Sequence, residues 1–490
     1  MREPQLCVTV TGRTMEDLRR ARDAAAGADL VEVRLDGVDR PDAAGALEGR
    51  LRPVIVTCRP LWEGGAFDGT EEDRRQILHD ALAAGAEFVD VEMRAAFAQE
   101  LVRLRRGRGV VLSLHSFGDC KPDVPETLRA LLSTGAEVVK LAYTARSLVD
   151  TLPLFEIGRH PDFRGNEQTR VLIAMGQPGA STRVLAARLG NRWTYAGDWI
   201  APGQMPASRL LGEYRYRRIQ PDADLYAVVG NPVAHSLSPA MHNAGFEYFG
   251  LNAAYVALEA RDVDDVVQFA RVMKLRGASI TAPFKVAMLS RVDNRDALAC
   301  EVGAINTLDV KDGRWLGSNT DVAGFVTPLK GRMVLKGTRA VVLGAGGAAR
   351  AVAVALKREG AAVRICARRA DEARQVATLV GVQAGPFPPL PGTWDVLVNA
   401  TSAGSRDGDR SPMEGVPLDG EIVFDLVYSP SETALVRQAR ESGCWTIGGI
   451  EMLIGQAERQ FDIWTGHAPP PGLFRDAVEA ASGWKTGVRS

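Results

Sequence analysis

The stretch "RAVVLGAGGAARAVAVALKREGAAVRICARR", residues 339–369, has the order strand, glycine turn, helix and second strand. A short apolar run rich in valine precedes Gly344, an alanine-rich segment of helical character follows, and Gly360 stands where the helix is expected to end. This order predicts a βαβ unit of the Rossmann type, with a parallel sheet.

The glycine turn of this unit has the pattern G-x-G-x-x-A. Gly344 permits a tight turn, Gly346 lets the backbone approach a pyrophosphate, and Ala349 takes the small third position. The helix N-terminus favours phosphate groups. We therefore expect this turn, including Gly347 and Ala348, to bind a dinucleotide cofactor.

The end of the second strand indicates which dinucleotide is bound. An NAD site would be expected to carry Asp or Glu there for the ribose hydroxyl, whereas this chain has Arg368 and Arg369. Arginines suit a 2′-phosphate, so the sequence predicts NADP. The alternative is that both side chains only solvate a strand end.

The first 200 residues contain short apolar, β-rich runs separated mostly by segments of helical composition, such as 15–26 and 72–84. Eight strands alternating with helices predict an α/β fold, a (β/α)8 barrel with its chemistry at the carboxyl ends of the strands. The expected strands are 6–12, 30–36, 53–59, 87–93, 109–117, 137–143, 170–176 and 192–197.

Polar residues interrupt these runs late in each strand, where a barrel places its active site. They are Glu32, Arg34, Arg59, Glu63, Asp90, Glu92, His115 and Lys140. Any one of them alone could be a solvated loop charge or a rim salt bridge. Their agreement over several strand ends favours a site.

Lys140 lies in "EVVKLAYT", residues 137–144, among valines, a leucine and an alanine. These neighbours should partly desolvate its ammonium group and free the neutral amine as a nucleophile, which attacks ketones. His115 could move protons, and Arg34, Arg59 and Arg183 could hold a carboxylate. The pattern predicts Schiff-base chemistry on a keto acid.

Residues 1–215 resemble the type I 3-dehydroquinate dehydratases. The shared motifs are "EVRLD" (32–36), "TCRPLWEGG" (57–65), "SLHSF" (113–117), "VVKLAYT" (138–144), "AMGQPGASTRV" (174–184) and "APGQ" (201–204). Another lysine-dependent barrel, such as an aldolase, would share the lysine without needing "EGG" and "APGQ". Ile200 departs from the family pattern, which has serine there, so one substrate hydrogen bond is in doubt.

This resemblance implies a role for each of the barrel residues. Lys140 would form an imine with the substrate ketone, and His115 would remove the adjacent proton and help water to leave. The implied substrate-binding residues are Glu32, Arg34, Arg59, Glu63, Arg183 and Gln204.

The second half begins after a charged, proline-containing link near 212–224. The clusters "NPVAHSLSP" (231–239), "SITAPFK" (279–285) and "GAINT" to "SNTD" (303–321) offer hydroxyls, an amide, a lysine and a carboxylate, which suit a polyol. With "NATSAG" (399–404), "DLVYSP" (425–430) and "GGIEMLIGQA" (448–457), they resemble the shikimate dehydrogenases over residues 225–475.

By this second resemblance, Lys285 and Asp321 form the catalytic pair that handles the hydroxyl proton, although such a pair is also a common salt bridge. The implied substrate-binding residues are Ser236, Ser238, Thr281, Asn306, Tyr428 and Gln456, and Thr401 and Gly449 join the cofactor set. The Ser236/Ser238 pair favours shikimate, with quinate as the alternative substrate. Ser279 and Ser405 depart from the more frequent family pattern, which suggests a looser nicotinamide pocket.

The two resemblances describe consecutive reactions, since the product of the first, 3-dehydroshikimate, is the substrate of the second. We predict a bifunctional enzyme with three domains: 1–218 is the barrel, 222–325 completed by 450–490 binds the second substrate, and 326–449 is the Rossmann domain. A binding or regulatory protein that kept both folds but lost catalysis is the alternative. Such a protein should first lose Lys140, His115, Lys285 or Asp321, and all four are present.

Composition agrees with small-molecule chemistry. The 490 residues include 59 basic and 60 acidic side chains, which gives no electrostatic footprint for nucleic acid or an anionic membrane. Six dispersed cysteines argue against disulfides or structural zinc, and no metal site is expected. No apolar run approaches the roughly 20 residues of a membrane span, and the first strand begins early, so we expect a cytoplasmic protein without a presequence.

Overall fold

The computed structural model describes residues 3–118, 121–163, 169–198, 201–406 and 410–483. The chain forms two compact units. The first comprises Met1–Leu225 and Leu251–Lys274, and the second comprises Tyr226–Gly250 and Leu275–Ser490. Within the described residues, no helix has the length and apolar character needed to cross a membrane.

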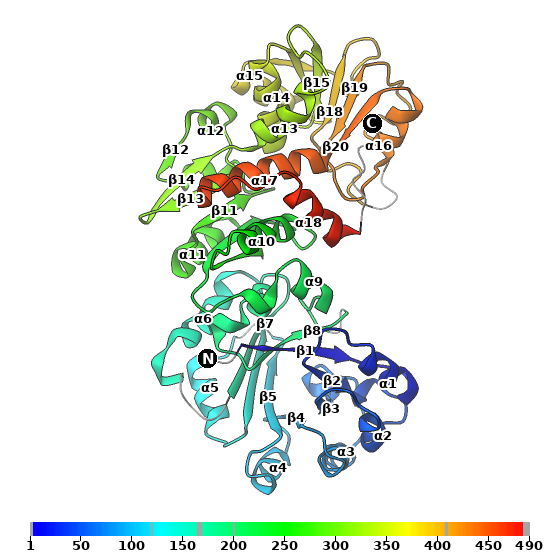
Figure 1. Ribbon diagram of the computed structural model, residues 1–490, viewed down its shortest axis with the longest axis vertical. Coiled ribbons are helices and arrows are strands. Elements are labelled where there is room, and N and C mark those ends of the chain that lie inside the picture. Colours follow the sequence, from blue (N-terminus) through cyan, green and yellow to red (C-terminus); the bar gives the residue numbers. More distant parts are fainter. Residues whose placement is uncertain (1–2, 119–120, 164–168, 199–200, 407–409, 484–490) are drawn as a thin grey trace. The chain divides into compact units, whose positions relative to one another are not determined.

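The first unit contains the predicted eight-stranded parallel barrel, which is confirmed (Figure 1). Its strand order is β7-β6-β5-β4-β3-β2-β1-β8, and a bridge between Arg170 and Asn191 brings the two outermost strands together. The strands are β1 Gln5–Val10, β2 Leu30–Arg34, β3 Val54–Thr57, β4 Phe88–Glu92, β5 Val110–Ser116, β6 Val138–Thr144, β7 Thr169–Met175 and β8 Trp193–Ala196.

Helices connect the strands and lie outside the ring (Figure 1). The third helix, α3, begins with a capping box in which Thr70 and Asp73 satisfy each other's backbone N–H groups. The helices of this unit are α1 Met15–Asp23, α2 Ala43–Leu47, α3 Glu71–Ala83, α4 Ala98–Leu104, α5 Val124–Leu132, α6 Leu152–Arg159, α7 Ser181–Val184, α8 Ala186–Leu189 and α9 Ala207–Gly212. β10 Ala253–Glu259 and α11 Val263–Met273 are grouped with it.

One expectation about the barrel is wrong. Lys140 is the third of seven residues in β6 rather than a late one, and its register partner in β5 is Ser113. Side chains alternate along a strand, so Val138, Lys140 and Ala142 share one face. Val138 and Ala142 belong to a buried apolar cluster drawn from all eight strands. The long lysine side chain therefore starts deep in the barrel.

The second unit contains a mixed sheet in which β9, β11, β13, β14 and β12 are neighbours in that order. β9 and β11 are parallel, whereas β13 is antiparallel to both of its neighbours. The strands are β9 Asp224–Gly230, β11 Gly277–Ile280, β12 Asn294–Arg295, β13 Thr307–Lys311 and β14 Arg314–Ser318. The helices are α10 Ser238–Tyr248, α12 Ala297–Val302 and α13 Asp321–Lys330.

The predicted Rossmann sheet is confirmed as a parallel sheet in the order β17-β16-β15-β18-β19-β20. Its strands are β15 Arg339–Leu343, β16 Ala362–Cys366, β17 Gln383–Gly385, β18 Val396–Asn399, β19 Ile422–Asp425 and β20 Trp445–Gly448. Its helices are α14 Gly347–Arg358, α15 Ala370–Val380 and α16 Ala434–Glu441.

The long helix α17 (Gly449–Thr465) leaves the Rossmann sheet directly after β20 and returns to the mixed sheet. Near its end, Trp464 Nε1 donates to the Leu308 carbonyl of β13 at 2.9 Å. The chain then continues into α18 (Leu473–Ser482), whose Phe474 packs edge-on against Phe461 of α17. The C-terminal segment thus completes the mixed-sheet half of the unit.

Candidate active sites

The barrel encloses a cavity of about 100 Å³ at the carboxyl ends of its strands. Every barrel residue to which the sequence assigned a catalytic or binding role lines it: Glu32, Arg34, Arg59, Glu63, His115, Lys140, Arg183 and Gln204. Thr9, Phe117 and Tyr195 also contribute to the wall. The described chain therefore brings together side chains from strands far apart in sequence. Ile200 lies outside the described residues.

Lys140 is held by two carboxylates and an aromatic ring. Its Nζ donates to Asp90 Oδ2 at 2.9 Å, lies 3.7 Å from Glu32 Oε1, and sits 4.5 Å from the centre of the Tyr195 ring. The side chain is only 6% exposed. The neighbours of Lys140 along the strand suggested an apolar environment for its amine. The carboxylates of Glu32 (β2) and Asp90 (β4) make that environment negatively charged instead.

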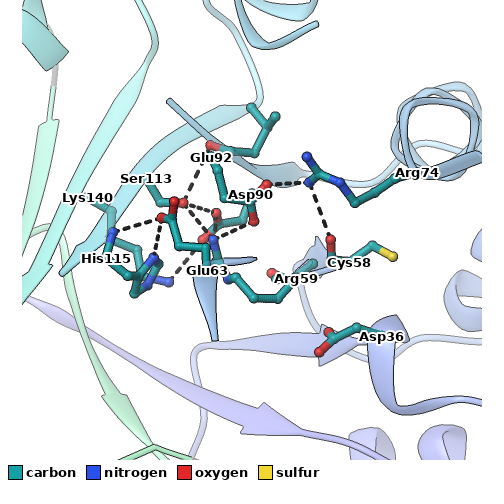
Figure 2. A network of polar contacts seen from close by, with 12 residues as sticks. Asp36, Cys58, Arg59, Glu63, Arg74, Asp90, Glu92, Ser113, His115 and Lys140 are labelled. Atoms are coloured by element: carbon teal, nitrogen blue, oxygen red, sulfur yellow. Dashed lines mark hydrogen bonds and ion pairs between the residues drawn. The ribbon is translucent and has the colours of Figure 1, made fainter. Parts of the chain in front are cut away.

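Asp90 is a partner of Lys140 that the sequence placed among the polar strand-end residues without assigning it a role. It is fully buried, which alone would raise the pKa of its carboxyl group, but the charges of Arg59 and Lys140 hold that pKa well below its usual value. Figure 2 shows it between Lys140 and Arg59. Its alternation with Glu92 in "EFVDVEM" was the available signal.

His115 is paired with Glu63. Glu63 Oε1 accepts from the backbone N–H of His115 at 2.8 Å and lies 3.0 Å from its Nδ1. Since one oxygen faces both nitrogens, the geometry favours a proton on Nδ1 and a free lone pair on Nε2. Glu63 Oε2 is buried and has no partner within the described chain. Phe117 stacks on the imidazole with ring centres 6.2 Å apart.

Burial drives both members of this pair towards neutrality. It lowers the pKa of His115 well below 6.5, with the charges of Arg59 and Lys140 acting in the same direction. It raises the pKa of Glu63 to about 7, against the opposing charge of Arg59. Near neutral pH, the imidazole is therefore uncharged and Glu63 is close to its titration midpoint.

Arg183 differs from the other guanidinium groups of the cavity. Arg34 forms a two-bond ion pair with Asp36, at 2.8 and 2.7 Å. Among the described residues, Arg183 donates only to the carbonyls of Ala174 (3.2 Å) and Pro202 (3.1 Å), and burial lowers its pKa to about 10. A buried cation without a counter-ion is costly unless a ligand supplies one, so Arg183 fits a substrate carboxylate.

A second cavity, of about 290 Å³, lies within the second unit. Its wall contains the predicted substrate and catalytic residues together with part of the predicted cofactor set. They are Ser236, Ser238, Thr281, Lys285, Asn306, Asp321, Ala348, Tyr428, Gly449 and Gln456.

Lys285 and Asp321 are in direct contact, with Nζ 2.5 Å from Oδ2. Asp321 is the first residue of α13 and is buried. Its other oxygen accepts from Asn306 Nδ2 at 2.8 Å, and the same amide nitrogen lies 3.5 Å from Gln456 Oε1. This network fixes the carboxylate and leaves Lys285 as the proton-bearing group at the cavity.

Ser279 lines the second cavity and forms a hydrogen bond that supports it. Its Oγ donates to Gln460 Oε1 at 2.6 Å, and Gln460 Nε2 donates to the Asn306 carbonyl at 3.1 Å. Gln460 of α17 therefore supports the site, and its helical spacing from Gln456 was the one available signal for it in the sequence. Burial raises the pKa of Tyr428, and a hydrogen bond with Ser236 opposes that shift.

The glycine turn fits a dinucleotide. Gly344 has φ +115°, and a Cβ there would lie 3.0 Å from the Ala400 carbonyl oxygen. Gly346 precedes α14, and a Cβ on it would meet nothing within 4 Å, so space is open before the helix N-terminus. A Cβ on Gly347 would lie 2.9 Å from Lys285 Cβ. The glycine turn thus packs on the stem of Lys285, the predicted catalytic lysine.

The remaining cofactor residues lie at strand ends of the same sheet. Thr401 follows β18 and donates from Oγ1 to Asn399 Oδ1 at 2.6 Å. Arg368 and Arg369 are exposed after β16, and Arg369 pairs with Glu372 at 2.8 Å. Ser405 is exposed. Among the described residues, no cluster of three or more His, Cys, Asp or Glu side chains could hold a metal ion.

Comparisons with known proteins find relatives of both the barrel and the second half of the chain. The type I 3-dehydroquinase family model matches residues 6–221, the shikimate dehydrogenase substrate binding domain matches 228–308, and the shikimate 5′-dehydrogenase C-terminal domain matches 449–479. A shikimate dehydrogenase (NADP+) of Natronomonas pharaonis is 41% identical over 53% of this chain and 99% of its own length. The crystal structure of the Aquifex aeolicus shikimate dehydrogenase covers 53% of this chain and 99% of its own, with 34% identity and a TM-score of 0.50.

A relative with both activities in its name covers nearly the whole chain. The chloroplastic bifunctional 3-dehydroquinate dehydratase/shikimate dehydrogenase of Arabidopsis thaliana is 34% identical over 486 residues, which is 91% of this chain and 79% of the relative. The family expected from the motifs is confirmed. The chain belongs to the bifunctional 3-dehydroquinate dehydratase/shikimate dehydrogenase family.

Proposed function

We propose that the chain dehydrates 3-dehydroquinate to 3-dehydroshikimate in the barrel cavity and reduces that product to shikimate with NADPH in the second cavity. One observation carries the proposal: each of two separate cavities is lined by the residues predicted for one of the two reactions, and the chain is similar over 91% of its length to a bifunctional relative. The relatives' names favour shikimate, so quinate is not proposed as the substrate.

The dehydration begins with Lys140. Its ammonium group releases a proton, the resulting amine adds to the substrate ketone, and a proton returns to the carbinolamine hydroxyl, which leaves as water and gives an iminium cation. The iminium carries the same positive charge as the ammonium, so Asp90 at 2.9 Å and Glu32 at 3.7 Å stabilise it in turn.

His115 then moves one proton twice. Its Nε2 takes the proton from the carbon next to the iminium carbon, and the electron pair neutralises the iminium nitrogen as an enamine. The enamine expels the hydroxyl of the next carbon, which takes the proton back from His115 and leaves as water. Hydrolysis of the remaining imine releases 3-dehydroshikimate and Lys140. Arg183 holds the substrate carboxylate throughout.

In the second cavity, side chains of the protein supply the proton for the reduction. NADPH, when bound, supplies the hydride. Lys285 Nζ delivers a proton to the carbonyl oxygen as it becomes a hydroxyl, and Asp321 and Asn306 keep Lys285 in place. The hydroxyls of Ser236, Ser238 and Tyr428 bind polar groups of the substrate. Gly344, Gly346 and the N-terminus of α14 would hold the pyrophosphate, and Arg368 would bind the 2′-phosphate.

Three further proposals concern the whole protein. We propose that residues 1–218, 222–325 with 450–490, and 326–449 act as barrel, substrate-binding and cofactor-binding domains. We also propose a cytoplasmic enzyme that works on small molecules without nucleic acid, although the Arabidopsis relative is named as chloroplastic. Fractionation of the source cells would test the location.

The function is tested by supplying 3-dehydroquinate and NADPH to the purified chain. We expect loss of the NADPH absorbance and a product with the mass of shikimate. 3-Dehydroquinate alone should yield 3-dehydroshikimate, and 3-dehydroshikimate with NADPH should yield shikimate. A chain that performs neither partial reaction would support the regulatory alternative.

A further inference from the structure

Arg74 is a buried arginine that lies outside the barrel cavity, on helix α3. The buried positions of α3 are Arg74, Leu78, Ala81 and Leu82, which is the spacing of an apolar stripe. Its side chain has no exposed surface. An apolar residue would fill this position at lower cost, because a buried charge must be matched by partners.

Charged and aromatic groups surround this guanidinium. Arg74 forms ion pairs with Glu92 and Glu71, and the Glu71 contact involves Nε at 3.0 Å and a second nitrogen at 2.6 Å. Its guanidinium carbon lies 4.9 Å from the Phe97 ring centre and 5.7 Å from that of Trp62. The side chain is therefore fixed in one place.

Glu92 connects Arg74 with the reacting amine. Figure 2 shows Arg74 at one end of the network and Lys140 with His115 at the other. Glu92 Oε1 accepts from Arg59 at 2.6 Å, Arg59 reaches Asp90 Oδ1 at 3.1 Å, and Asp90 Oδ2 accepts from Lys140 at 2.9 Å. Positive and negative groups thus alternate over the five side chains.

Glu92 depends on both of its guanidinium partners. It is fully buried, which raises the pKa of its carboxyl group, and the charges of Arg59 and Arg74 oppose that rise. Without Arg74, a single cation would remain to stabilise the carboxylate. A protonated Glu92 would no longer balance the charge of Arg59. Asp90 would then be the remaining carboxylate of this chain of contacts, and Arg59 and Lys140 would compete for it.

We propose that Arg74 is a positioning residue for the dehydration: it keeps Glu92 charged, so that Arg59 and Asp90 hold Lys140 where it attacks the substrate. This inference rests on the proposed dehydration in the barrel. Arg74 touches neither the cavity nor, on this account, the substrate.

The test compares Arg74→Met, Arg74→Lys and Arg75→Met in the full chain. Arg75 is the next residue of α3, and its ion pairs with Glu72 and Glu100 are solvent-exposed. We expect Arg74→Met to lower kcat for dehydration about 10- to 100-fold with KM within about twofold, Arg74→Lys to recover most of it, and Arg75→Met to match wild type. Reduction of 3-dehydroshikimate, which is proposed for the second unit, should stay unchanged.

A double-mutant cycle with Glu92→Gln tests the route. If Arg74 acts through the charge of Glu92, Arg74→Met should cost much less in the Glu92→Gln background than in wild type. Unchanged kcat in Arg74→Met, or full additivity with Glu92→Gln, would overturn the proposal. If Arg74→Met does not fold, Glu92→Gln alone must reproduce the loss of kcat, and wild-type kcat there would equally overturn it. Absence of dehydration in wild type would instead refute the proposed function.

Discussion

At the scale of single residues, the protonation of Glu63 decides whether His115 is ready to act. Only an ionised Glu63 can accept the Nδ1 proton of His115 and leave Nε2 free as a base. Burial brings the pKa of Glu63 to about 7, whereas that of His115 is lowered well below 6.5. We therefore assign the acid limb of the pH–rate profile for dehydration to Glu63.

We predict that kcat/KM for dehydration rises with pH through a midpoint near 7, because Glu63 of the free enzyme is protonated below it and ionised above it. Glu63→Gln should lower kcat by about 100-fold and remove this limb. The measurement is a pH–rate profile of both proteins. A limb that persists with the same midpoint in Glu63→Gln would assign it to another group.

Arg183 allows binding to be separated from stability, since its charge has no acidic partner in the described chain. We predict that Arg183→Met raises KM for 3-dehydroquinate about 10- to 100-fold, the value of a charge-assisted hydrogen bond, without lowering the unfolding midpoint. Arg170→Met is the matched control, because Arg170 is also buried and donates to the Leu189 carbonyl at 3.0 and 3.1 Å. That variant should lose stability and keep its KM. A fall in the unfolding midpoint of Arg183→Met, with KM unchanged, would make Arg183 structural.

At the scale of elements, the N-terminus of α14 is the predicted phosphate site and packs against Lys285. A Cβ on Gly347 would push against Lys285, whereas one on Gly346 would enter only the open space before the helix. We predict that Gly347→Ala lowers kcat for reduction about tenfold, and that Gly346→Ala mainly raises KM for NADPH. Steady-state kinetics of both variants decide this. Identical effects of the two substitutions would contradict the packing argument.

Whole strands and helices are what the sequence could predict. All eight barrel strands and the βαβ unit follow from short apolar runs, glycine turns and helical spacing, which are local signals. The roles of Asp90 and Arg74 do not, because they depend on contacts between side chains of β2, β3, β4, β6 and α3, which are far apart in the sequence. Lys140 was expected late in its strand, but position along a strand is set by barrel register rather than by the strand's own residues.

At the scale of the whole molecule, nucleophile and cofactor turn belong to different compact units of one chain. Either reaction should therefore be removable while the other remains. In Lys140→Ala, NADPH oxidation started by 3-dehydroquinate should disappear, and oxidation started by 3-dehydroshikimate should persist at the wild-type rate. Loss of both in a folded variant would contradict two independent sites.

The most direct measurement is reductive trapping of the imine. Borohydride added with 3-dehydroquinate reduces the C=N bond and fixes the substrate skeleton on the lysine nitrogen, which peptide mass spectrometry can locate. We predict a mass increase on the peptide that contains "EVVKLAYT", with loss of dehydration and full retention of 3-dehydroshikimate reduction. No adduct, or an adduct on a lysine other than Lys140, would contradict the account.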